Sequence, residues 1–137
     1  MHSADERLQA IAAKSHKEAL YHVKWSSDWV IRLGDGTPES HERMQKAIDA
    51  LWPYKGELTS PNEVEQEALR LGYGVDLDVL KNRRDQKIEE VLTEATLSIP
   101  QDQYVQEGGK DGRHSEHLGY ILADLQFLQR SYPGLEW

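Results

Sequence analysis

The stretch SADERLQAIAAKSHKEALYHVKWSSDWVIRLGDG, residues 3–36, decides the fold of this chain. Apolar and small side chains recur along it at steps of three and four residues, the period of one face of an α-helix. Ser3 followed by Glu6 predicts a capping box at the start, and Gly34 suits a C-terminal cap. The pattern therefore predicts one helix from Ser3 to Leu33, about thirty residues and roughly 45 Å long. The repeating positions are Leu8, Ile11, Ala12, Ser15, Ala19, His22, Ser26, Trp29 and Leu33.

Four further helices are predicted from their start and stop signals. Each has an N-cap residue or a first-turn proline before its apolar period, and a glycine or proline close after it. For the last helix we expect Ser115 or His114 to act as the cap and His117 to pack inward. The expected helices run from Thr37 to Trp52, from Ser60 to Gly72, from Asp76 to about Leu97, and from His114 to Ser131.

The segment 99–113 interrupts this series. It keeps no helical period and contains Gly108, Gly109 and Gly112, so we expect an irregular, glycine-rich loop. The sequence indicates neither a strand nor an internal repeat. We therefore predict an all-α chain with about five helices. Residues 1–137 are expected to form a single all-α domain or a fragment of one.

The composition excludes several classes of function. The chain has 137 residues, 38% of them hydrophobic, and a formal net charge of −8 at pH 7. Because nucleic-acid phosphates are bound by clustered lysine and arginine, no nucleic-acid partner is expected. The absence of cysteine excludes disulfides and thiolate metal sites. Neither a signal peptide nor a membrane span is indicated, so we expect a cytoplasmic protein with no membrane partner.

Glu18 and His22, four residues apart on the first predicted helix, are a candidate for a metal site. Carboxylate-bridged di-iron bundles instead use a glutamate and a histidine three residues apart. None of the 6 histidines has a glutamate three residues before it, and Ala19 holds that place for His22. Two interpretations remain open: a working metal site, or an i,i+4 polar pair on a half-exposed face.

His114 and His117 form a second candidate at the start of the last helix. Two imidazoles are the minimum that suggests a zinc site, but a zinc-site prediction requires a third ligand. Together with Glu18 and His22 they give the alternative hypothesis of a small, independent helical metalloprotein.

Two basic segments are also candidates for binding. Lys110 and Arg113 lie in the glycine-rich loop just ahead of a helix start, where backbone amides and cations can cradle a phosphate. The loop lacks the spacing of a nucleotide-binding loop, so a hinge or docking loop is expected. The second segment is a basic run within the fourth helix and is expected to be a solvated face. Its residues are Lys81, Arg83, Arg84 and Lys87.

Several segments, in order along nearly the whole chain, carry a resemblance to one family. They are KEALYH at 17–22, RLGDGT at 32–37, MQKAI at 44–48, EATLSIPQ at 94–101, GGKDGRHSEHLG at 108–119 and LQFLQR at 125–130. The chain resembles the C subunits of bacterial phenylacetyl-CoA epoxidases, the multicomponent monooxygenases of aerobic phenylacetate catabolism. An ordered set of segments is more specific than any single motif.

The resemblance implies a ferritin-like subunit without catalytic or cofactor-binding residues of its own. In this family the related A subunit carries the di-iron centre and binds the thioester substrate, so no metal or other cofactor is expected on this chain. Ala19 stands where a catalytic subunit keeps a glutamate. The implied role is that of a non-catalytic partner of the catalytic A subunit. The candidate docking residues are Trp25, Trp29, Lys110, Arg113, His114, Glu116 and His117.

The resemblance covers only the C-terminal part of such a subunit. Three of the four core bundle helices would then lie upstream of Met1, and the helix from Ser3 to Leu33 would be the fourth. Its inner seam is polar, and a helix with an uncovered inner face recruits another chain. We therefore expect either a homo-oligomer or a requirement for the missing N-terminal half.

Overall fold

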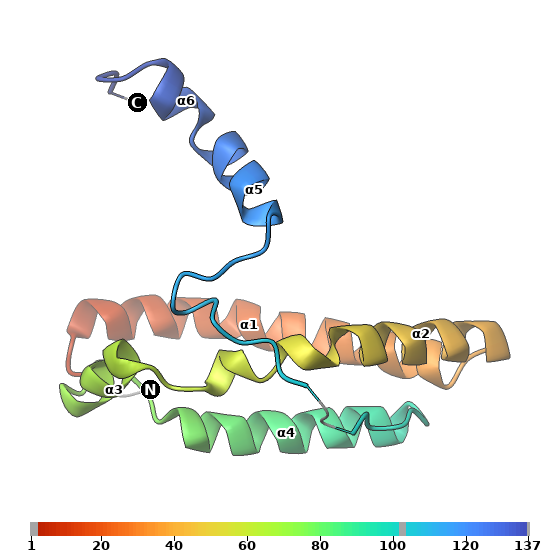
Figure 1. The fold of residues 1–137 in the computed structure, drawn as a ribbon. Helices are drawn as coiled ribbons and strands as arrows, with labels where there is room; N and C mark the ends of the chain where they lie inside the picture. The colour runs from red at the N-terminus through yellow and green to blue at the C-terminus, as the bar shows by residue number, and fades with distance from the viewer. Residues whose placement is uncertain (1–2, 102–103, 137) are drawn as a thin grey trace. The chain divides into compact units, whose positions relative to one another are not determined.

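The computed structural model describes residues 3–101 and 104–136, and all of their regular structure is helical. One unit, Met1–Gln106, contains α1 (Glu6–Gly34), α2 (Pro38–Leu51), α3 (Glu63–Arg70) and α4 (Leu77–Glu94) (Figure 1). Short 3₁₀ turns, η1 (Trp52–Tyr54) and η2 (Glu57–Thr59), connect α2 to α3. The other unit, Glu107–Trp137, contains α5 (His117–Leu125) and α6 (Phe127–Ser131). The all-α prediction is confirmed.

The first helix exists as predicted, but its cap is different. Asp5 accepts a hydrogen bond from the amide of Leu8 at 2.9 Å, and α1 therefore begins at Glu6. Ser3 lies outside the helix, where its hydroxyl donates to the carbonyl of Tyr73 at 3.4 Å. The predicted capping box of Ser3 and Glu6 is wrong, because the nearer carboxylate of Asp5 already occupies the position that a cap needs.

The starts of the next three helices follow the predicted signals. Thr37 and Asn62 each form a complete capping box, and the carboxylate of Asp76 accepts from two amides of the first turn of α4. These side chains satisfy amide groups that have no partner within a helix. Figure 1 shows α2 folding back along the C-terminal half of α1, with α4 beside them.

The end of α4 lies earlier than the predicted Leu97. The helix stops at Glu94, and Thr96 adopts the left-handed region with a φ of 59°. The amide of Leu97 then donates to the carbonyl of Leu92 at 2.9 Å, which closes the last turn in the manner of a Schellman motif. A threonine at this position carries a steric penalty that a glycine would not.

The core of this unit lies where α1 and α4 end. Leu92, Ala95 and Leu97 are buried, and Gly34 at the end of α1 packs directly against them. A Cβ atom added to Gly34 would lie 2.6 Å from the carbonyl oxygen of Ala95. The predicted capping role of Gly34 is wrong, because the helix cap is Asp35; Gly34 is required for the close approach of the two helix ends.

The connection after α4 runs back along α2. The side-chain amide of Gln45 exchanges two hydrogen bonds with the backbone of Ser98, at 2.8 and 3.0 Å. Further on, the amide of Gln106 donates to the carbonyl of Pro53 at 2.9 Å. A side chain of α2 therefore holds one end of this irregular segment, and a backbone carbonyl of η1 holds the other.

The second unit differs from the single helix predicted over 114–131. The helical part of this unit begins at His117 and is interrupted at Gln126, between α5 and α6. No side chain caps the start of α5. Ser115 and Glu116 contribute only backbone carbonyls, which accept from amides three residues on. The predicted cap by Ser115 or His114 is therefore wrong, and His117 is exposed rather than packed inward.

We predict that Thr96→Gly raises the free energy of unfolding by about 1 kcal/mol, because it removes the left-handed penalty on a side chain. Urea denaturation followed by circular dichroism measures the change. The matched control is Thr93→Gly, which lies in the last helical turn and should lower stability by roughly 0.5 kcal/mol. A destabilised Thr96→Gly variant would contradict the assignment of this helix end.

We also predict that Gly34→Ala lowers the free energy of unfolding by about 2–3 kcal/mol, because the methyl group must displace Ala95 or Leu97. The matched control is Gly119→Ala in α5, where an added Cβ meets nothing within 4 Å. That variant should leave the first unit's unfolding transition unchanged. Equal transitions for both variants would contradict the close helix contact.

Candidate interaction surfaces

Glu18 and His22 form a loose pair on the outside of α1. The Oε1 atom of Glu18 lies 3.9 Å from the Nε2 atom of His22, and their side chains are 76% and 66% exposed. An exposed pair at this distance contributes little to stability. The geometry is that of an i,i+4 polar pair, as in the second of the two interpretations of the sequence.

The described residues do not fit a di-iron site. Such a site needs carboxylates and histidines from four helices that converge on one point. No group of three or more His, Asp or Glu side chains is placed to hold a metal ion within residues 3–101 and 104–136. Glu18 and His22 lie in the first unit, whereas His114 and His117 lie in the second.

The polar seam predicted for α1 is exposed to solvent within the first unit. Ser15, Ala19 and Ser26 are all exposed, and α1 packs on the core through Val30 and Ile31 instead. This face ends in a pair of aromatic side chains, Trp25 and Trp29. Their ring centroids lie 6.3 Å apart in an edge-to-face arrangement, and the side chains are 56% and 44% exposed. We call this surface the tryptophan face.

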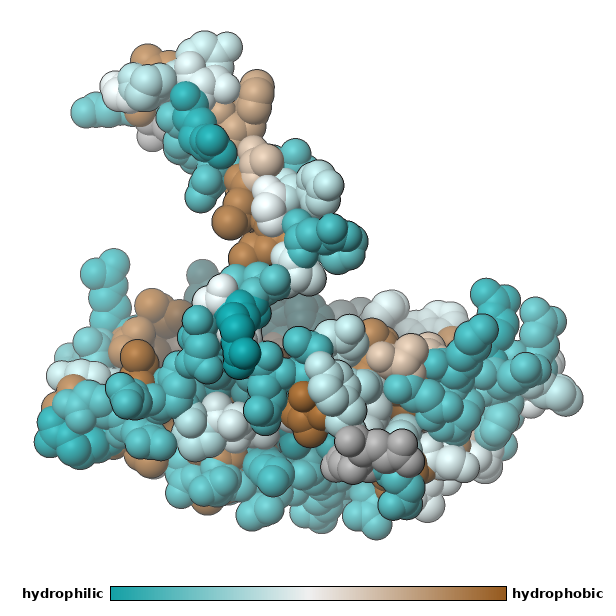
Figure 2. All heavy atoms as spheres, viewed as in Figure 1, coloured by the Kyte–Doolittle hydropathy of each residue, from teal (hydrophilic) through white to brown (hydrophobic). Residues whose placement is uncertain are grey.

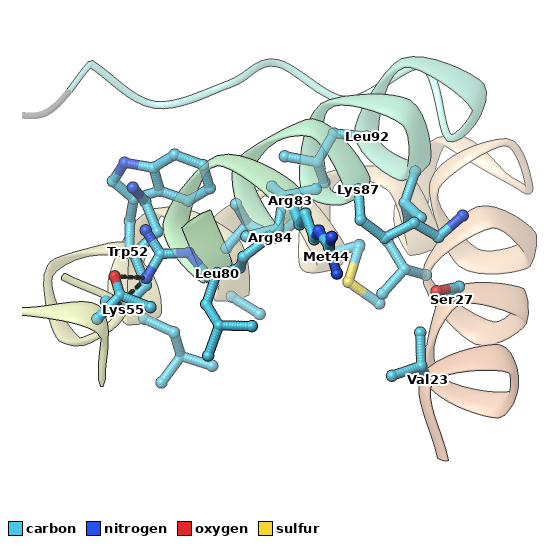
Figure 3. A pocket seen from close by; sticks show the side chains of 17 residues that line it. Val23, Ser27, Met44, Trp52, Lys55, Leu80, Arg83, Arg84, Lys87 and Leu92 are labelled. Carbon is cyan, nitrogen blue, oxygen red and sulfur yellow. Dashed lines mark hydrogen bonds between the residues drawn. The ribbon is translucent and has the colours of Figure 1, made fainter. Parts of the chain in front are cut away.

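A groove of about 750 Å³ opens between α1, α2 and α4 (Figure 3). Its floor is apolar and includes Met44, Ile48, Leu80, Ile88 and Leu92. The groove could not be predicted from the sequence, because periodicity shows which face of a helix is apolar but not whether another element covers it.

Basic side chains of α4 line the same groove. Arg83, Arg84 and Lys87 project from α4 among apolar side chains (Figure 3). Lys81 is not among the residues that line the groove. The prediction of a solvated face holds for Arg83 and Lys87, which are exposed, and is wrong only for Arg84, which is partly buried. The register of α4 against α1 and α2, which no local pattern specifies, turns these side chains toward the groove.

Arg84 is the best-fixed cation in the groove, and its side chain is only 19% exposed. Its guanidinium donates to the carbonyl of Lys55 at 2.8 Å and to the hydroxyl of Thr59 at 2.7 Å. A further contact at 2.8 Å joins it to Asp85. Arg84 therefore ties the turns after α2 to α4 and shapes one wall of the groove.

The other candidate docking residues lie in the second unit. The backbone of Gly108–Arg113 forms a tight loop in which the amide of Arg113 donates to the carbonyl of Gly108 at 2.8 Å. His114, Glu116 and His117 follow with exposed side chains. The apolar side chains of α5 and α6 are also exposed, and Figure 2 shows them as brown surface along these helices. They include Ile121 at 54% and Leu125 at 69% exposed.

Two ion pairs, one on α1 and one on α3, lie on the surface of the first unit. The ammonium of Lys24 donates to Asp28 at 2.6 Å and holds the pKa of that carboxyl below its usual value. The guanidinium of Arg70 likewise lowers the pKa of Glu67.

Among the described residues, no helix combines the length and the apolar character that crossing a membrane requires.

Comparison with known proteins gives a family match and a relative. The family model described as phenylacetic acid catabolic protein matches residues 1–137. The C subunit of the 1,2-phenylacetyl-CoA epoxidase of Escherichia coli (strain K12) is 43% identical over 137 residues, which is 100% of this chain. The match covers 55% of that relative, so the chain spans about half the length of the curated relative. The resemblance drawn from the sequence is confirmed.

We predict that Arg84→Ala lowers the free energy of unfolding by about 1–3 kcal/mol, because it leaves the buried hydroxyl of Thr59 and the carbonyl of Lys55 without their donor. Arg83→Ala is the matched control on the neighbouring residue and should change stability by less than about 0.5 kcal/mol. Thermal unfolding measures both. Equal losses for the two variants would contradict the role of Arg84 in fixing the groove wall.

Proposed function

Because the chain belongs to the phenylacetic acid catabolic protein family, we propose that it is a non-catalytic interaction subunit, or part of one, of a phenylacetyl-CoA epoxidase. The observation that supports this most is the identity of 43%, along the whole chain, to the E. coli relative. The ferritin-like fold of this family serves in this chain as a binding scaffold rather than as a metal site. We expect the complex to act in the cytoplasm.

In this proposal the chemistry belongs to the partner. The catalytic A subunit holds the di-iron centre and the thioester substrate, and the complex transfers one oxygen atom of O2 to the aromatic ring as an epoxide. The other oxygen atom leaves as water, with electrons supplied by a separate reductase. The exposed pair of Glu18 and His22, with no third ligand among the described residues, supports a role without a metal on this chain.

The tryptophan face is the surface through which we propose that the first unit binds the catalytic A subunit. Large aromatic side chains carry much of the binding energy of protein interfaces when a partner buries them. Trp25 and Trp29 are adjacent, half-exposed and placed beside small residues that allow a partner helix to approach closely. In the second unit, the proposed contacts are Lys110, Arg113, His114, Glu116 and His117.

We predict that Trp25→Ala and Trp29→Ala each weaken binding to the catalytic A subunit by at least about tenfold, the effect expected of a buried aromatic anchor. Isothermal titration calorimetry of the purified proteins measures this. The matched control is Tyr54→Ala, because Tyr54 in η1 is an equally exposed aromatic residue outside the tryptophan face. A failure of the unaltered chain to bind any A subunit would contradict the proposed function.

The alternative of an independent metalloprotein has a direct test. Elemental analysis of protein purified without added metal should give less than about 0.1 equivalents of iron, manganese or zinc, because no described group offers three ligands. One equivalent of any of these metals, lost in the Glu18→Ala or His114→Ala variant, would overturn the proposal of a subunit without a metal.

A further inference from the structure

The groove between α1, α2 and α4 exposes an apolar floor that no other described part of the first unit covers. Met44, Ile48 and Ile88 reach the small core only at one end, and Leu51 and Leu80 remain 66% and 39% exposed. Contiguous apolar surface of this kind marks a site where another element binds. Removing this apolar surface from water would favour binding of that element.

The dimensions of the groove match an α-helix. Its lining residues on α4 extend from Leu80 to Leu92. Twelve steps along a helix are about 18 Å at 1.5 Å per residue, or more than three turns. The walls are themselves helices, and an amphipathic helix laid along such walls buries one apolar face.

The charges of the groove specify the polar side of its occupant. Lys55, Arg83, Arg84 and Lys87 line it, and no Asp or Glu side chain among the described residues does, although the chain as a whole carries a net charge of −8. Arg84 is held by Asp85 and by the turns after α2. Arg83 has no hydrogen bond or ion pair within the described part of the chain. Its charge is therefore available to a carboxylate on an incoming element.

We propose that the groove binds an acidic amphipathic helix that belongs to the part of the family fold that this chain does not span. The match covers 55% of the E. coli relative, so nearly half of that protein has no counterpart in this chain. Apolar side chains of the helix fill the floor, and its carboxylates meet Arg83, because Lys87 already pairs with Glu90 at 3.4 Å. The inference depends on the fold of the family and is independent of the proposed catalytic complex.

A thiol placed in the groove tests the position of the occupant. The chain has no cysteine, so a single Ser27→Cys substitution in the groove gives a unique label. The full chain is co-expressed with the segment of the E. coli relative that it does not span, and the purified complex is treated with a maleimide. We expect Ser27→Cys to react at least about tenfold more slowly in the complex than in the chain alone, because a docked helix excludes the reagent.

The matched control is Lys24→Cys, on the polar face of α1, whose reactivity should be the same in the chain and in the complex. An unprotected Ser27→Cys in the complex, or the absence of any complex, would overturn the proposal. Protection of Ser27→Cys in the chain alone, together with sedimentation as a dimer, would also overturn it, because a second copy would then fill the groove.

A charge reversal tests the acidic side of the helix. Arg83→Glu should weaken binding of the E. coli segment by about tenfold, whereas Lys81→Glu makes the same change on α4 outside the groove and should have an effect of less than about twofold. Equal effects of both variants would overturn the electrostatic part of the inference. Failure to bind the catalytic A subunit, with Ser27→Cys still protected, would count against the proposed function alone.

Discussion

The first unit depends on a contact between two helix ends that only a glycine permits. Gly34 closes α1 against Ala95, just beyond the end of α4, and any side chain at Gly34 would overlap the carbonyl there. Leu92 and Leu97 complete this small core. Because the contact lies at one end of both helices, it aligns α1 with α4 and leaves most of their length to be covered by something else. The groove and the tryptophan face are the two consequences.

Local chemistry in the sequence predicted the starts of α2, α3 and α4, whereas it misplaced the caps of α1 and α5. Thr37, Asn62 and Asp76 each supply a side-chain acceptor to nearby amides, and a cap of this kind is complete within a few residues. The end of α4 is different, because Thr96 adopts a left-handed conformation that its residue type disfavours. Tertiary packing of Ala95 and Leu97 imposes that conformation. No propensity argument could have found it.

Of the two candidate surfaces, the sequence predicted the tryptophan face but not the groove. The aromatic pair Trp25 and Trp29 could be placed on one face of α1 from spacing alone, and the structure brings the two rings together. The groove needed the register of α4 against α1 and α2, which is a property of the assembled helices. That register places the exposed side chains of Arg83 and Lys87 along the apolar groove, which the sequence pattern does not show.

The two uncovered faces of α1 impose different requirements on whatever covers them. Toward the groove, Val23 and Val30 offer apolar contacts beside a basic rim, which favours an acidic amphipathic helix. Toward the tryptophan face, His22 and the hydroxyl side chains need hydrogen-bonding partners once they are buried. A helix that is uncovered on two such unlike sides suits an interior position between two layers. In the proposed complex, α1 would therefore contact the acidic helix on one side and a second polypeptide on the other.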